Sequence, residues 1–165
     1  MGEFDSVDEV LEFAIAREIE ANEFYKVLSG RVENPAMREL ILEFAKEELE
    51  HRATLEMEVM KRGGVVTEVQ RQAEARKLED FTLADYIVDT GDWLYMDYVD
   101  LLVLAMKKEK ASFRLYVDLA GLVNDEDTHE VLVSLAEEEA RHKMRFELEY
   151  DEMVLKKKTK GQETE

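Results

Sequence analysis

The sequence contains no cysteine, which removes several classes of protein from consideration. Without cysteine a chain forms no disulfide bond, no thiolate metal site and no iron–sulfur cluster. Proline occurs once and glycine seven times in 165 residues, so few positions interrupt a regular backbone. Glutamate, lysine, leucine, alanine and methionine are abundant instead, and these residues favour helices. The composition therefore predicts a single all-α domain built from long helices.

Long apolar runs and positive charge are scarce as well. The longest fully apolar run extends only from Leu101 to Met106, whereas a membrane-spanning helix needs about 20 such residues. Lysine and arginine number 22 against 40 aspartates and glutamates, and the net charge of -18 would repel nucleic-acid phosphates. The first residues, MGEFDSVDEV, lack the basic start and apolar core of a signal peptide. We therefore expect a cytoplasmic protein that binds neither nucleic acid nor membranes.

Four long helices are predicted from apolar periodicity and from residues that favour helix ends. Ser6 and Glu9 form a capping box at the start of the first helix, which should end near Ser29. The other three helices are expected from Pro35 to Gly63, from Asp97 to Leu122, and from 125–127 to about Lys157. Residues 1–158 would form the domain, followed by a flexible tail at 159–165.

The segment 63–96, between the second and third predicted helices, is mostly polar with scattered apolar residues. It is too long for a simple turn between antiparallel neighbours. A segment of this length suits a crossover that returns along a helix bundle. The second and third helices would then run in the same direction.

The two halves of the sequence repeat each other. When the chain is shifted by 91 residues, Leu11–Glu58 aligns with Leu102–Glu149 without a gap, and 14 of the 48 positions are identical. Both copies contain Glu-x-x-His, and only three histidines occur in the chain, so chance is a poor explanation for two that match in register. Each half is interpreted as a helical hairpin, and two hairpins make a four-helix bundle.

The same spacing predicts that a set of acidic and histidine side chains meets inside the bundle. Glu18 and Glu48 are each about fifteen residues from the turn between their helices, or roughly 22 Å along the axis, so antiparallel packing places them at the same height. His51 follows Glu48 by three residues and shares its helix face. In the second copy, Glu109 and Glu139 lie at the same distance from their turn, and His142 follows Glu139 by three residues. The six side chains expected at mid-bundle are Glu18, Glu48, His51, Glu109, Glu139 and His142.

Such a cluster needs partners of opposite charge. Four ionised carboxylates in an apolar interior would repel one another, and their pKa values would rise until most of them bound protons. Two divalent cations would balance the four negative charges, and two neutral imidazoles would complete the ligand set. Mixed oxygen and nitrogen ligands suit iron or manganese, and zinc also fits. The sequence therefore predicts a site for two metal ions.

These residues resemble the ferritin-like di-iron carboxylate proteins, whose bundles carry glutamate on two helices and Glu-x-x-His on the other two. The run AIAREIEANEFY at 14–25 resembles stand-alone rubrerythrin-like domains, and AMKKEKASFRLY at 105–116 matches more loosely. The resemblance implies iron as the metal. It implies two bridging ligands, Glu48 and Glu139, two terminal carboxylates, Glu18 and Glu109, and one histidine for each ion, His51 and His142.

The resemblance also implies an oxidoreductase that reduces peroxide or dioxygen and protects against oxidative stress. Full rubrerythrins carry a cysteine-rich rubredoxin module, which this chain lacks, so an external electron donor such as a rubredoxin would be required. They also carry an additional glutamate where this sequence has Ser112. Iron storage in a larger shell is the alternative function, and hydroxylation of an organic substrate is a third. A homodimer or larger homo-oligomer is expected.

Two further pairs of repeated residues have open roles. Tyr25 and Tyr116 lie two turns from the ligand glutamates of their own helices and would either donate hydrogen bonds or electrons near the metals, or pack in the core. Glu47 and Glu138 point about 100° away from the neighbouring ligand glutamates. They are expected either in solvent or just outside the metal ligands.

Overall fold

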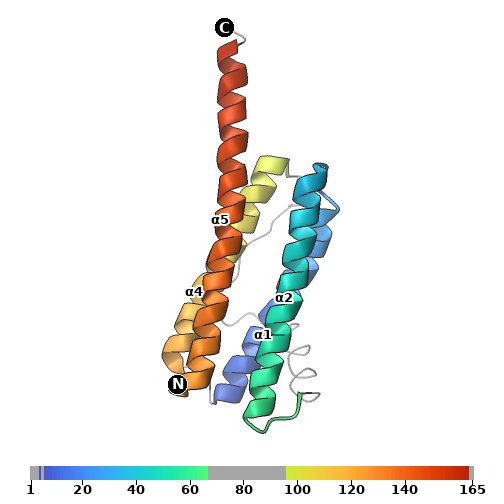
Figure 1. Ribbon diagram of the computed structural model, residues 1–165. Coiled ribbons are helices and arrows are strands. Elements are labelled where there is room, and N and C mark those ends of the chain that lie inside the picture. Colours follow the sequence, from blue (N-terminus) through green and yellow to red (C-terminus); the bar gives the residue numbers. More distant parts are fainter. Residues whose placement is uncertain (1–3, 5, 67–95, 164–165) are drawn as a thin grey trace.

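The computed structural model describes residues 4, 6–66 and 96–163, and every regular element in this part of the chain is a helix (Figure 1). The helices are α1 (Val7–Ser29), α2 (Pro35–Lys61), α4 (Tyr98–Leu122) and α5 (Glu126–Glu163). The prediction of an all-α bundle is therefore confirmed. Among the described residues, none of the helices is both long and apolar enough to cross a membrane.

The bundle consists of two antiparallel hairpins, α1 with α2 and α4 with α5, which lie side by side (Figure 1). Equivalent helices in the two hairpins begin 91 residues apart, at Val7 and Tyr98 and at Pro35 and Glu126, as the sequence repeat predicts. Helices α2 and α4 run in the same direction, as expected for a long crossover between them. Most of the crossover predicted at 63–96 lies outside the described residues.

Each helix begins at a side chain that accepts hydrogen bonds from backbone N–H groups of its first turn. This contact satisfies donors that have no partner within the helix. The accepting side chains are those of Ser6, Asn34, Asp97 and Asp125, at donor–acceptor distances of 2.9–3.2 Å. At the other end of α2, Gly63 adopts a φ of 84°, a left-handed conformation that glycine tolerates better than other residues. The local sequence therefore sets where the helices begin, and hence the height of every residue along them.

Helix α5 is longer than predicted. It ends at Glu163 rather than near Lys157, and its last turns project beyond the other helices (Figure 1). The lysine-rich sequence of this region explains the extension, because lysine favours helices. The flexibility of the tail at 159–165 stays a prediction.

The hydrophobic core is divided into two clusters at opposite ends of the bundle. One cluster joins the first half of α1 and the second half of α4 to facing residues of α2 and α5, with Leu11, Leu55, Leu119 and Leu132 at its centre. The other joins the opposite halves of the same helices and includes Leu28, Ile41, Leu102 and Phe146. The predicted metal-binding residues belong to neither cluster. They occupy the layer between the two, which places polar groups where apolar side chains exclude water.

Candidate metal centre

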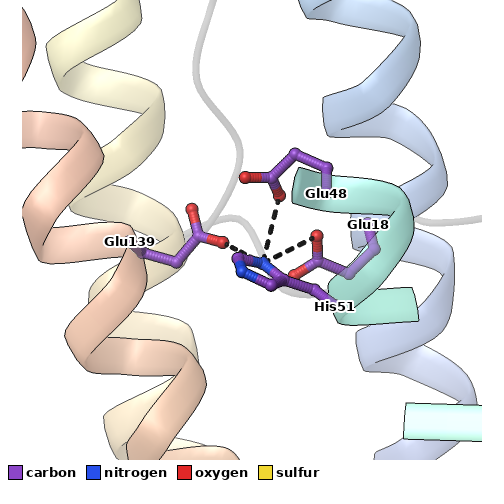
Figure 2. Close-up of side chains that lie close together, drawn as sticks. All are labelled: Glu18, Glu48, His51 and Glu139. Carbon is purple, nitrogen blue, oxygen red and sulfur yellow. Dashed lines mark hydrogen bonds and ion pairs between the residues drawn. The ribbon is translucent and has the colours of Figure 1, made fainter. Parts of the chain in front are cut away.

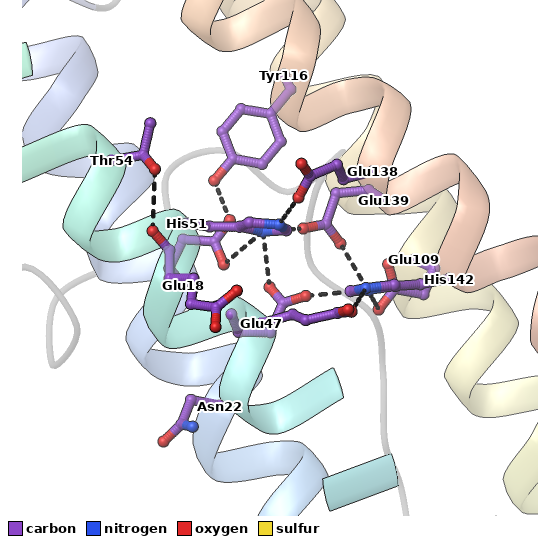
Figure 3. Close-up of polar contacts among 12 residues, drawn as sticks. Glu18, Asn22, Glu47, His51, Thr54, Glu109, Tyr116, Glu138, Glu139 and His142 are labelled. Carbon is purple, nitrogen blue, oxygen red and sulfur yellow. Dashed lines mark hydrogen bonds and ion pairs between the residues drawn. The ribbon is translucent and has the colours of Figure 1, made fainter. Parts of the chain in front are cut away.

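All six side chains predicted at mid-bundle converge in this layer (Figure 2 and Figure 3). Each of the four helices contributes, and every one of the six residues is only 1–4% exposed. The convergence follows from the local sequence, because three-residue spacing puts glutamate and histidine on one face of α2 and of α5. His129, the third histidine, is exposed at the start of α5 and lies outside the cluster. The predicted arrangement is therefore present, whereas the role of these residues as ligands stays a prediction.

The first half of the cluster is centred on His51 (Figure 2). Its Nδ1 atom lies 3.0 Å from Oε1 of Glu139, a residue of the opposite hairpin. The same nitrogen lies 3.6 Å from Oε2 of Glu18 and 3.8 Å from Oε2 of Glu48. Three carboxylates from three helices therefore surround one imidazole nitrogen.

The second half repeats this geometry around His142. Its Nδ1 atom lies 3.1 Å from Oε1 of Glu48, 3.6 Å from Oε1 of Glu109 and 4.0 Å from Oε2 of Glu139. In each half, four ligand atoms lie within 4.8 Å of one another, which is close enough to surround one metal ion. Glu48 and Glu139 belong to both halves, the arrangement expected of bridging ligands.

Burial and mutual repulsion disfavour the ionised form of these carboxyl groups in the absence of metal. Burial raises the pKa of Glu109 to about 8, and the charge of Glu18 acts in the same direction. Burial, followed by the charges of neighbouring glutamates, also raises the pKa values of Glu48 and Glu139 well above their usual range. Glu18 is the exception, because hydrogen bonds with Glu48, His51 and Tyr116 outweigh its burial and lower its pKa. The metal-free cluster therefore retains protons on carboxyl groups that are normally ionised at neutral pH.

The pKa values of the two histidines are also raised, although burial acts on a histidine in the opposite direction. Burial alone would lower the pKa of His51, but hydrogen bonds to Glu139, Glu18 and Glu48 outweigh it and raise the pKa. The pKa of His142 is raised for the same reason, chiefly by Glu48 and Glu139. Protons thus supply the positive charge that the carboxylates require. Metal ions in the same place would displace these protons.

The donor atoms at the centre fit a pair of metal ions. Among the described residues, several buried oxygen and nitrogen atoms of the cluster have no hydrogen-bond partner, which is rare in protein interiors. These atoms are Oε2 of Glu18, Glu109 and Glu139, Oε1 of Glu48, and Nδ1 of His142, and all but Oε2 of Glu109 lie 3.1–4.0 Å from an ion-pair partner within the cluster. Four carboxylates and two imidazoles match the mixed oxygen and nitrogen coordination of iron and manganese. Unsatisfied acceptors of this kind are explained if cations bind between them.

The outward-facing nitrogen of each histidine contacts a glutamate of the opposite hairpin (Figure 3). Nε2 of His51 lies against the carboxylate of Glu138, and Nε2 of His142 against that of Glu47. When Nε2–H donates to these carboxylates, the lone pair of a neutral ring on Nδ1 points to the cluster. The sequence repeat identifies Glu47 and Glu138 as a pair but leaves their role open. The contacts across the hairpins place both just outside the ligand set.

Glu47→Ala and Glu138→Ala are each expected to weaken metal binding by about 10- to 100-fold, because the histidine loses the acceptor that orients it. Competition with a chelator of known affinity measures the loss. Glu137→Ala is the matched control, since Glu137 is the exposed neighbour of Glu138 on the same helix. Equal affinities for all three variants would show that these glutamates do not orient the histidines.

The two repeated tyrosines are both buried, but they differ in their contacts. The Tyr116 O–H donates to Oε1 of Glu18 across the hairpins, and burial, followed by the charge of Glu18, raises its pKa well above the usual range. Tyr25 packs against the rings of Phe44 and Phe146. Tyr116 therefore contacts a predicted ligand, whereas the ring of Tyr25 contacts aromatic side chains of the core, and a role for either tyrosine beside metal ions stays a prediction.

A model of the rubrerythrin family matches residues 9–150. No curated protein matches the chain. Three solved structures are similar to this chain in fold. A hypothetical protein from Pyrococcus furiosus is 25% identical, with a TM-score of 0.62 and 91% of each chain covered.

Two further solved structures share the fold at lower identity. A dodecameric thioferritin, the bacterioferritin-related protein of Bacteroides fragilis, is 20% identical with a TM-score of 0.68, over 93% of this chain and 89% of that one. KatB, a manganese catalase from Anabaena, is 21% identical with a TM-score of 0.66, over 92% of this chain and 74% of that one. Both likenesses concern the ferritin-like four-helix architecture.

Proposed function

Because the chain belongs to the rubrerythrin family, we propose that it is a dinuclear metal oxidoreductase that reduces peroxide or dioxygen with electrons from an external donor. The observation that carries this proposal is the buried cluster of four glutamates and two histidines, whose central atoms lack hydrogen-bond partners among the described residues. The ion pairs within the cluster set four buried carboxylates against only two imidazoles, an excess of acidic groups that two cations would balance.

The side chains of this protein have three roles in the proposed reaction. Glu48 and Glu139 would bridge two metal ions, each of which would also be held by a terminal glutamate and a histidine. Glu47, Glu138 and Tyr116 would hold the ligands in place through hydrogen bonds. The apolar clusters at both ends of the bundle exclude water and limit side reactions.

The reaction requires two electrons and two protons to convert hydrogen peroxide into two molecules of water. The metal pair would supply the electrons as each ion passes from the divalent to the trivalent state. Because this chain has no cysteine and hence no iron–sulfur or rubredoxin-type centre, a separate protein that carries single electrons would return them. We propose iron as the metal, with manganese as the alternative; zinc fits the same ligands but has no redox chemistry and would not support the reaction.

Anaerobic protein loaded with ferrous iron is expected to consume one hydrogen peroxide per two iron ions, with an absorbance increase in the near ultraviolet. Stopped-flow absorbance and a peroxide assay measure the stoichiometry, with free ferrous iron at equal concentration as the control. Reduced rubredoxin should then support repeated turnover. Protein that stays ferrous in the presence of peroxide would refute the proposal, and elemental analysis of protein from iron-supplemented cells would test the choice of metal.

Iron storage is the second candidate, and the likeness to a dodecameric thioferritin is the observation that favours it. Storage requires a closed shell of many chains and an iron content far above two per chain. Light scattering coupled to size-exclusion chromatography gives the mass of the assembly, and iron analysis gives the content. A small oligomer with about two iron ions per chain supports the oxidoreductase, whereas an iron-filled shell supports storage.

A further inference from the structure

The two halves of the cluster differ in what surrounds their terminal glutamates. On one side, the Tyr116 O–H donates to Oε1 of Glu18 from the opposite hairpin (Figure 3). On the other side, the equivalent tyrosine, Tyr25, is 1% exposed, and its O–H has no hydrogen-bond partner in the described part of the chain. Oε2 of Glu109 and Oε2 of Glu18 both lack a hydrogen-bond partner among the same residues, so the difference between the two halves lies in the tyrosines. The pseudo-symmetry of the sequence repeat is therefore broken at these two positions.

A small hollow between α1 and α4 lies at this unpaired side. Tyr25 and Glu109 both line it, together with Ala21 and Ser112. Its volume of about 10 Å³ is close to the space that one water molecule needs. The hollow has the polar groups that a small bound molecule requires, because the tyrosine O–H can donate and the carboxylate can accept.

Charged side chains cover the outer end of the hollow. Glu20 accepts from Arg17 at 2.7 Å and from Lys108 at 3.3 Å, and the three residues join α1 to α4. The Lys108 ammonium group also lies 4.5 Å from the centre of the Phe24 ring. The ion pairs of these side chains would have to separate for a small molecule to pass, a change that involves side chains and leaves the helices in place.

We propose that the half of the metal centre formed by Glu109 and His142 takes the exogenous oxygen ligand, water or peroxide, beside the hollow lined by Tyr25. In the half formed by Glu18 and His51, the equivalent tyrosine hydroxyl of Tyr116 already donates to Glu18. The inference rests on the proposed function for the presence of metal ions. It adds the position at which the exogenous ligand binds. It also gives Tyr25 a role, because a buried O–H without a partner costs folding free energy unless a bound molecule accepts its hydrogen bond.

Azide is a suitable probe, because it is a slender anion that binds ferric iron with a visible charge-transfer band. In crystals of the iron-loaded protein soaked with azide, the anion is expected on the ion held by Glu109 and His142, with Tyr25 Oη within hydrogen-bond distance. Azide on the ion held by Glu18 and His51 would overturn the inference. In crystals of the metal-free protein, an ordered water is expected at Tyr25 Oη, and direct donation from Tyr25 to Glu109 would count against it.

A pair of matched substitutions tests the hollow in solution. Ala21→Leu fills it and is expected to weaken azide binding by roughly tenfold or more while the metal content stays unchanged. Ala111→Leu makes the same change on α4 at a partly buried position that does not line the hollow, and should alter the affinity by no more than about twofold. Equal azide affinities in the two variants would refute the inference.

The two proposals fail in different ways. If the protein binds azide beside Tyr25 but does not reduce peroxide, the inference holds and the proposed function is refuted. If the protein reduces peroxide but binds azide beside Tyr116, the proposed function holds and the inference is refuted. If the protein takes up no metal, both proposals are refuted.

Discussion

Glu139→Gln is expected to stabilise the metal-free protein and, at the same time, to remove its capacity for two metal ions. Glu139 is buried, and burial together with the charge of Glu109 raises its pKa, so the neutral glutamine resembles the form that the interior favours. Each unit by which the folded state raises a carboxyl pKa corresponds to about 1.4 kcal/mol of stability lost at neutral pH, and a glutamine, which does not ionise, avoids this loss. His51 loses one carboxylate partner but keeps Glu18, Glu48 and Glu138.

The effect on metal is opposite in sign. Glu139 contributes to both groups of potential ligands, and an amide oxygen is a weaker ligand than a carboxylate for iron or manganese. The metal content is therefore expected to fall from about two ions per chain to less than one. Chemical denaturation measures the stability of the metal-free protein, and elemental analysis measures the metal.

Glu58→Gln is the matched control for this experiment. Glu58 is equally buried in α2, but it accepts a hydrogen bond from the Thr128 O–H at 2.8 Å and lies outside the cluster. This variant should gain no stability and should bind metal as the unaltered protein does. If Glu139→Gln binds two ions with unchanged affinity, the cluster is not a dinuclear site. If it loses stability without metal, Glu139 serves mainly as an ion-pair partner of His51.

Metal loading is expected to raise the melting temperature, by an amount that grows with pH. A ligand at 100 times its dissociation constant contributes about 2.7 kcal/mol, so two sites contribute about 5 kcal/mol. For a domain of this size, that corresponds to a shift on the order of 10–20 °C. Scanning calorimetry of metal-free and loaded protein between pH 5 and pH 8 measures the shift.

The pH dependence follows from the direction of the pKa shifts. The usual value of 4.5 for a glutamate rises to about 8 for Glu109 in the folded, metal-free protein. Between these values the folded chain holds a proton that the unfolded chain has released, so the stability of metal-free protein falls as pH rises. The raised pKa values of Glu48 and Glu139 act in the same direction, as do those of the histidines above 6.5. The lowered pKa of Glu18 acts in the opposite direction, but only below 4.5.

Metal binding should remove this dependence, because the ions replace the protons. The difference in melting temperature between loaded and metal-free protein should therefore widen from pH 5 to pH 8. Glu139→Gln without metal should show a weaker fall with pH than the unaltered chain, which separates the cluster from the general repulsion of an acidic surface. A difference that is constant with pH would contradict the proton–metal exchange.

The positions of the predicted ligands along the bundle could be obtained from local patterns. Asn34 and Pro35 mark the start of a helix because of their capping chemistry, and the structure begins α2 there. From that start, the rise per residue and the three-residue spacing place Glu48 and His51. The repeat extends the same argument to the second hairpin. The length of α5 was predicted less well, because a run of lysines favours a helix while also being typical of an exposed tail.

Helical periodicity and the register of the two copies are local properties, and they are enough to predict a four-helix bundle with six potential ligands on inward faces. The contacts of Glu47 and Glu138 with the histidines of the opposite hairpin could be recognised in the folded bundle but not in the sequence. The same holds for the contact of Tyr116 with Glu18 and for the hollow that Tyr25 faces beside Glu109. These contacts depend on how the two hairpins rotate and pack against each other. That rotation is set by the volumes of many side chains together, which a repeat of single residues does not encode.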